Sequence, residues 1–108
     1  MDVQLKRGVL DICVLTVLSK GESYGYQIIK DLSGCIEISE STLYPILKRL
    51  EKNECVTVHT VEHNSRLRKY YHITEEGLHR IDEFLEEWKE MMGIYHFIEK
   101  QAKGGEDQ

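Results

Sequence analysis

The sequence lacks the features that mark membrane or exported proteins. Its longest mainly apolar run, residues 9–18, contains Asp11 and covers 10 residues, whereas a membrane-spanning helix needs about 20. The first residues carry no apolar segment of the kind that directs export. The three cysteines are odd in number and far apart, which favours reduced thiols over a disulfide framework. We therefore expect a cytoplasmic protein with no membrane partner.

Patterns typical of enzymes and metal sites are lacking too. No CxxC or HExxH spacing occurs among the three cysteines and five histidines. There is no Gly-rich phosphate loop, and no serine stands in a nucleophile elbow. The sequence therefore predicts no enzyme, no metal site and no cofactor.

Positive charge is scarce overall but unevenly distributed. The formal net charge is −5, yet residues 1–74 carry 10 Lys and Arg against 9 Asp and Glu, whereas residues 75–108 carry 4 against 10. Net charge reports solubility better than it reports where a ligand binds. A nucleic-acid surface in the first two thirds of the chain is therefore compatible with the acidic total.

Hydrophobic spacing predicts three helices, a β-hairpin and a fourth helix. The first three helices cover about residues 4–19, 23–32 and 39–53, and the third has an i, i+3, i+4, i+7 stripe of Leu43, Ile46, Leu47 and Leu50. Alternating β-branched and aromatic residues predict strands over 55–61 and 67–73, joined by a polar tip of about five residues. This order indicates a mostly α fold with a small β-hairpin, a winged helix-turn-helix.

The last predicted helix, residues 75–101, is too long for the domain that precedes it. At 1.5 Å per residue it measures about 40 Å, and an apolar seam runs along it. A second copy of the chain is the simplest cover for that seam. We expect a homodimer with an interface formed by Leu5, Val9, Leu85, Trp88, Met92 and Tyr95.

The third helix and the hairpin carry the candidate DNA contacts. In helix-turn-helix proteins the second helix of the motif enters the major groove, which corresponds here to residues 39–53. Its outer face bears hydroxyls and cations, with Arg49 at the margin, although such a face is often simply solvated. Tyr44, at the other margin, suits packing as well as phosphate contact. The candidates are Ser41, Tyr44, Lys48 and Lys52 on the helix and Arg66, Arg68 and Lys69 on the hairpin.

Four passages resemble one known family in order and spacing. They are residues 24–28 (YGYQI), 41–51 (STLYPILKRLE), 68–74 (RKYYHIT) with Gly77, and Trp88. On these passages the chain resembles the PadR-like family of bacterial transcriptional regulators, and its single helix after the wing resembles the smaller subfamily. Where that family tends to have glycine after the third helix, this chain has Glu54. We expect Asn53 to take the left-handed conformation there instead.

The resemblance implies a homodimeric DNA-binding regulator, usually a repressor, that occupies a palindromic operator in double-stranded promoter DNA. It adds Thr42 to the candidate DNA contacts. Together with the residue pattern, this predicts a winged-helix DNA-binding domain at 1–74 and a C-terminal dimerisation helix at 75–101 within the same compact unit. The polar, glycine-rich composition of the last residues predicts a disordered tail at 102–108.

The resemblance also implies an alternative role for Trp88. Some small PadR-like proteins are multidrug sensors whose paired tryptophans hold a planar ligand at the dimer centre. By that analogy, Trp88, Met92 and Val14 are candidate contacts for a small hydrophobic effector, with Met91 and Cys13 as further lining residues. A tryptophan on a helical seam is nevertheless more often part of the dimer core. A third alternative is a dimerisation module that binds no DNA.

Overall fold

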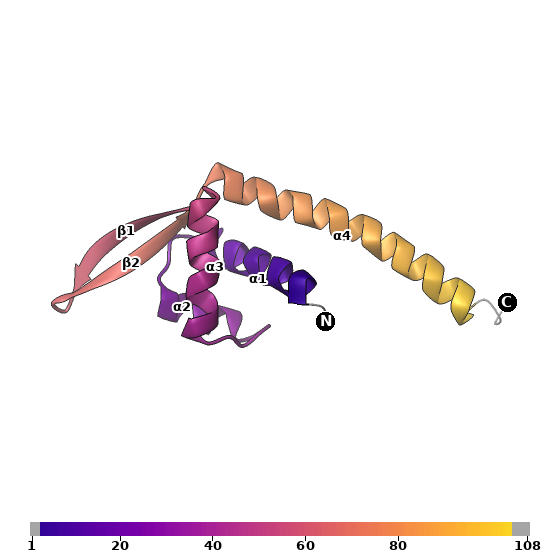
Figure 1. The fold of residues 1–108 in the computed structure, drawn as a ribbon, viewed down its shortest axis with the longest axis horizontal. Coiled ribbons are helices and arrows are strands. Elements are labelled where there is room, and N and C mark those ends of the chain that lie inside the picture. Colours follow the sequence, from indigo (N-terminus) through magenta and orange to yellow (C-terminus); the bar gives the residue numbers. More distant parts are fainter. Residues whose placement is uncertain (1–2, 105–108) are drawn as a thin grey trace.

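The structure is a computed structural model that describes the backbone of residues 3–104 and the side chains of residues 7–104. Figure 1 shows α3 upright at the centre, with the hairpin projecting to one side and α4 to the other. This confirms the predicted fold, a mostly helical winged helix with a long final helix. The elements are α1 (Val3–Leu18), α2 (Gly25–Leu32), α3 (Glu40–Lys52), β1 (Val56–His63), β2 (Arg66–Ile73) and α4 (Glu75–Ala102).

The core lies where α1, α2 and α3 meet beside the base of the hairpin. The stripe predicted on α3 is buried in full, and it packs with Leu15, Leu18 and Ile28, each at most 1% exposed. Burial of one leucine contributes about 1.5–3 kcal/mol. At the start of α3 the Thr42 amide donates to Ser39 Oγ at 3.3 Å, the expected N-cap. Anchoring of the inner face leaves the outer face of α3 in solvent.

The turn after α3 differs from the expectation for Asn53. That residue has φ −88°, and Glu54 takes the left-handed conformation at φ 63°. The reason lies in the hydrogen bonds: the Asn53 amide still donates to the Arg49 carbonyl at 3.0 Å, and the Cys55 amide donates to the Leu50 carbonyl at 2.8 Å. The chain therefore reverses one residue later than predicted, and it does so without glycine.

The hairpin is longer and its tip shorter than predicted. Pairing continues to His63 opposite Arg66, so the turn contains two residues and not five. Asn64 and Ser65 have φ 53° and 66°. Positive φ at both central residues gives a turn whose twist matches paired strands, which lets the strands run to the tip. Arg66, expected in the tip, is consequently a strand residue, whereas Arg68 lies in the strand as predicted.

Two contacts attach the wing to the rest of the fold. The Tyr71 amide donates to the Ser23 carbonyl at 2.7 Å, and the Ser23 amide donates to the Tyr71 carbonyl at 3.1 Å. Where β2 ends, at the base of the wing, Thr74 Oγ1 donates to the Glu54 carbonyl at 2.7 Å and accepts from the Gly77 amide at 3.1 Å. A Cβ at Gly77 would stand 2.5 Å from the Cys55 carbonyl oxygen. The junction of α3, wing and α4 is therefore closely packed.

Helix α4 is mostly uncovered. Gly77 is its one buried residue among those described, and α1 lies beside its first half only, while the second half extends away from the domain (Figure 1). The large apolar side chains from Leu85 to Ile98 are 37–65% exposed. The helix continues to Ala102, so this residue, expected in the tail, is helical; residues 105–108 lie outside the described residues. Within the described chain, no helix has the length and apolar character to cross a membrane.

The left-handed Glu54 provides a test of the turn geometry. Glu54→Gly removes a conformational cost of about 1–2 kcal/mol for a non-glycine residue and adds about 0.5–1 kcal/mol of backbone entropy. We expect the free energy of unfolding, measured by urea denaturation, to rise by about 0.5–1 kcal/mol. The control Glu51→Gly, inside α3, should lower it by about 1 kcal/mol. A lower stability for Glu54→Gly would contradict the turn described above.

Candidate nucleic-acid interface

The outer face of α3 carries five of the predicted contacts. Ser41, Thr42, Tyr44, Lys48 and Lys52 are all exposed. Neither lysine ammonium has a carboxylate within 4.0 Å in the part of the chain that the structure describes. These two cations are therefore available to an anionic partner.

Tyr44 combines the two roles that the sequence left open. Its ring and hydroxyl lie against Gly25 of α2, where an added Cβ would come 2.5 Å from Tyr44 Oη. The residue is nevertheless 44% exposed. Beneath it, burial raises the pKa of Tyr71, and Tyr44 and Glu51 raise it further. The upward shift of the pKa favours the neutral form of the Tyr71 hydroxyl, as expected for a phenol that is shielded from water.

Arg68, in the half of β2 nearer to the tip of the wing, is held in place by two tyrosines. Its Cζ lies 4.0 Å from the centre of the Tyr24 ring, and Nη1 donates to Tyr70 Oη at 3.4 Å. This hydrogen bond is the main cause that raises the pKa of Arg68. The two rings also meet edge to face at 5.4 Å. Arg68 is therefore a cation with a fixed direction, whereas Arg66 and Lys69 are exposed.

A hollow of about 630 Å³ separates the start of α3 from the wing. Of the predicted contacts, Tyr44, Arg66, Arg68 and Lys69 line it; the remaining four lie on α3 outside it. Sequence reasoning missed Tyr26, which lines the hollow and is 63% exposed, because tyrosines next to an apolar stripe are typical of packing. The one acidic side chain among the lining residues is Glu40.

Arg49 does not belong to this cationic surface. The sequence placed it at the margin of the exposed face, but its Nη2 donates to Asp11 Oδ1 at 2.6 Å and its Nε to Oδ2 at 3.2 Å. Asp11 lies on α1 and is only 5% exposed. The guanidinium is thus turned inward to satisfy a buried carboxylate.

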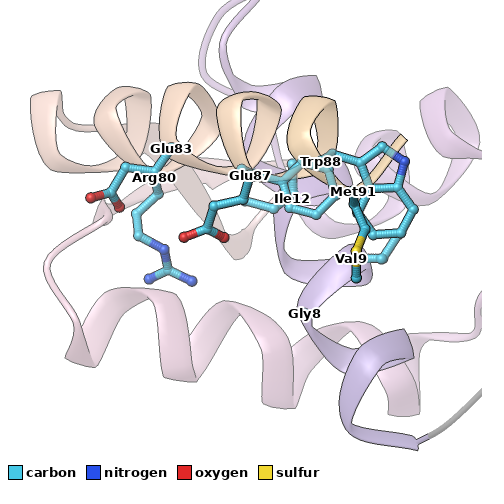
Figure 2. A pocket seen from close by; sticks show the side chains of 9 residues that line it. Gly8, Val9, Ile12, Arg80, Glu83, Glu87, Trp88 and Met91 are labelled. Carbon is cyan, nitrogen blue, oxygen red and sulfur yellow. The ribbon is translucent and has the colours of Figure 1, made fainter. Parts of the chain in front are cut away.

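A second hollow, a groove of about 440 Å³, lies between α1 and α4. Figure 2 shows Trp88 and Met91 of α4 next to Val9 of α1. The Phe84 and Trp88 rings stack at 5.5 Å with an interplanar angle of 14°. The lining residues are Gly8, Val9, Ile12, Arg80, Glu83, Phe84, Glu87, Trp88 and Met91.

The groove changes the set of candidate ligand contacts. Trp88 and Met91 line it as expected, whereas Met92 and Cys13 are not among the lining residues. Val14 is 0% exposed in the core, so the structure removes it from the candidates, and Val9 and Ile12 present the α1 side instead. The reason is that Val14 lies on the face of α1 that packs into the core.

The predicted interface residues are placed as follows. Leu85, Trp88, Met92 and Tyr95 are 59%, 37%, 40% and 53% exposed on α4, and Val9 is half-buried in the groove. The side chain of Leu5 lies outside the described residues. No group of three or more His, Cys, Asp and Glu side chains arranged for a metal ion occurs among the described residues.

Known proteins with this arrangement are transcriptional regulators. A PadR-like transcription factor from Bacteroides fragilis is 32% identical, with 88% of this chain and 94% of that chain covered and a TM-score of 0.80. PadR of Bacillus subtilis, solved with operator DNA, is 28% identical over 71% of this chain and 46% of that one, with a TM-score of 0.66. An uncharacterized protein of Lysinibacillus sphaericus is 34% identical over 93 residues, which cover 82% of this chain and 85% of that protein.

The sequence pattern of one family covers most of the fold described above. It matches residues 14–83, from the middle of α1 to the first turns of α4, and is that of the transcriptional regulator PadR-like family. Members of this family are regulators of transcription and not enzymes. This chain therefore belongs to the PadR-like family of transcriptional regulators.

Proposed function

We propose that this regulator is a homodimeric repressor that occupies a palindromic operator in promoter DNA, in the cytoplasm. Two observations carry the proposal. On the exposed face of α3, Lys48 and Lys52 pair with no carboxylate among the described residues. Next to that face, one hollow is lined by Tyr44 of α3 and by the wing cations Arg66, Arg68 and Lys69. The Bacillus subtilis relative that was solved with operator DNA supports it.

The two basic elements, α3 and the wing, would contact different parts of the DNA. An α-helix fits the major groove, so α3 would bring Ser41, Thr42, Tyr44, Lys48 and Lys52 to phosphates and base edges. The wing would place Arg66, Arg68 and Lys69 against the adjacent backbone. Each phosphate that these cations neutralise releases counterions, so affinity falls as salt rises. Repression then follows from occupancy of the promoter.

A second copy would cover the apolar side chains of α4. The interface would contain Val9, Leu85, Trp88, Met92 and Tyr95, with Leu5 as a further candidate. A pair of α4 helices packed in this way would hold two α3 helices at a fixed separation. Half-sites read by such a pair lie about 34–36 Å apart, one turn of DNA.

Lys48→Ala tests the DNA-binding surface. Loss of one phosphate contact should weaken binding to DNA from upstream of the chain's own gene by roughly 5- to 30-fold and reduce the slope of log affinity against log salt by about 0.9. Titration by fluorescence anisotropy at several salt concentrations gives both numbers. The matched control is Lys100→Ala on α4. Equal affinities for wild type and Lys48→Ala would remove Lys48 from the surface, and a folded dimer that binds no DNA in low salt would favour a dimerisation module.

Leu85→Glu tests the interface. A carboxylate on the apolar side of α4 would have to be desolvated between the two copies, so we expect a monomer by sedimentation velocity, with DNA affinity greatly reduced. Leu67→Glu is the control for the sedimentation measurement alone, because Leu67 is a 78% exposed leucine on the wing, away from the proposed interface but within the proposed DNA-binding surface. If Leu85→Glu stayed dimeric, the proposed interface would be wrong.

The α1–α4 groove favours a second function, that of a sensor for a planar hydrophobic ligand. Its apolar walls and the stacked Phe84–Trp88 pair fit an aromatic molecule. Since the groove lies against α4, a bound effector would shift the angle or spacing between the two α3 helices. Repression and sensing are compatible in one dimer.

Trp88 is the single tryptophan of the chain, so its fluorescence reports on the groove. We expect 9-aminoacridine, added without DNA, to quench it with a saturable profile. Met91→Ala should weaken the affinity by roughly tenfold, because complete burial of a methionine contributes about 1.5–3 kcal/mol and a ligand in the groove would cover only part of this side chain. Ile94→Ala, at a 55% exposed residue of α4 outside both the groove and the proposed interface, should leave the affinity unchanged. Linear quenching without saturation, or equal effects of Met91→Ala and Ile94→Ala, would count against this site.

A further inference from the structure

Asp11 is the single charged residue that is buried among the described side chains, at 5% exposed. It lies within the apolar run of α1, and its two carboxylate oxygens accept from Arg49 Nη2 and Nε at 2.6 and 3.2 Å. This arrangement joins α1 to α3 across 38 positions of the sequence. No other ion pair among the described residues connects two helices.

Stability alone does not explain such a pair. Desolvation of two charges consumes most of their mutual attraction, and apolar residues of similar size often serve stability as well or better. What the pair supplies is geometry. The planar guanidinium binds both carboxylate oxygens in one orientation, so it fixes the relative position of the two helices more narrowly than apolar contacts do.

The location of the pair connects two surfaces. On α1, Asp11 is followed directly by Ile12, which lines the groove against α4. On α3, Arg49 is preceded by Lys48, which is exposed on the outer face. A shift of α1 would therefore move Asp11 relative to Arg49. A change in the geometry of this pair would in turn change the orientation of α3, and with it the direction in which Lys48 points.

We propose that Asp11 and Arg49 are positioning residues that set the orientation of α3 on α1 and thereby direct its outer face to the operator, without contact between either residue and DNA. The inference rests on the proposed function. It reverses the role that the sequence favours for Arg49, an arginine at the edge of a cationic helix face.

Asp11→Asn distinguishes a positioning role of Asp11 from a purely electrostatic effect of its charge, because the two predict opposite changes in operator affinity. Removal of a negative charge from a DNA-binding protein normally strengthens its attraction to phosphate. If Asp11 positions α3, the same substitution should weaken operator binding, because asparagine cannot accept both donors of the guanidinium as a carboxylate does. Arg49→Lys keeps the charge and loses the bidentate geometry, so it should have the same effect.

The experiment compares two duplexes: an operator that the wild-type protein selects from a random-sequence library, and an unselected duplex of equal length. The variants are Asp11→Asn, Arg49→Lys and the double variant Asp11→Asn/Arg49→Gln, with Glu51→Gln on the exposed side of α3 as the control. We expect the first two to lose roughly five- to tenfold in operator affinity, with affinity for the unselected duplex unchanged. The double variant should bind the operator no more weakly than either single variant, and the slope of its log affinity against log salt should equal that of the wild type.

Three results would overturn the proposal. Equal losses on both duplexes would mean that the pair only maintains the fold. A salt slope reduced by about 0.9 in the double variant would mean that Arg49 contacts phosphate. Unchanged operator binding by Asp11→Asn, with the wild type selecting an operator, would defeat positioning but leave the proposed function intact.

If the wild type selected no sequence, the proposed function would fail as well. Circular dichroism identifies unfolded variants, and Arg49→Lys carries the test if Asp11→Asn does not fold.

Discussion

Burial of one face of α3 is the constraint on which the rest of the structure depends. Leu43, Ile46, Leu47 and Leu50 form the centre of a small core, each at most 4% exposed. A helix anchored along one side must present the other side to solvent. The polar and cationic residues of α3 are therefore displayed as a consequence of packing, and the wing attached next to it by Tyr71 extends the same surface.

The second constraint is the exposed apolar surface along the later turns of α4. Its first turns are fixed against Cys55 and α1, while its later turns present large apolar side chains to solvent. A single domain has too little chain to cover a helix of 28 residues. This imbalance gives the homodimer proposal its physical basis. It also places the groove with Trp88 between the domain and the helix that would join two copies.

Local backbone conformations shape the wing without the glycines that usually supply them. Glu54, Asn64 and Ser65 have positive φ. The first reverses the chain after α3, and the other two close a tight hairpin turn. As a result the wing is fully paired to its tip, and its arginines have strand geometry. Tertiary contacts, such as the Thr74 hydrogen bond to the Glu54 carbonyl, offset the cost at the first of these positions.

The sequence by itself determined the order of elements, the two faces of α3 and the apolar side of α4, because these depend on periodicity, which is a local property. Only the tertiary structure decided which charged and apolar residues face which neighbour. Arg49 turns inward to pair with Asp11, which lies 38 positions away in the sequence, so no local pattern reveals the pair. Arg68 is likewise held by Tyr24, which belongs to another part of the chain. Val14 packs in the core, whereas Val9 and Ile12 face α4. The sequence does not predict this division, because a helix that is apolar on nearly all sides has no periodicity to indicate which face packs against which element.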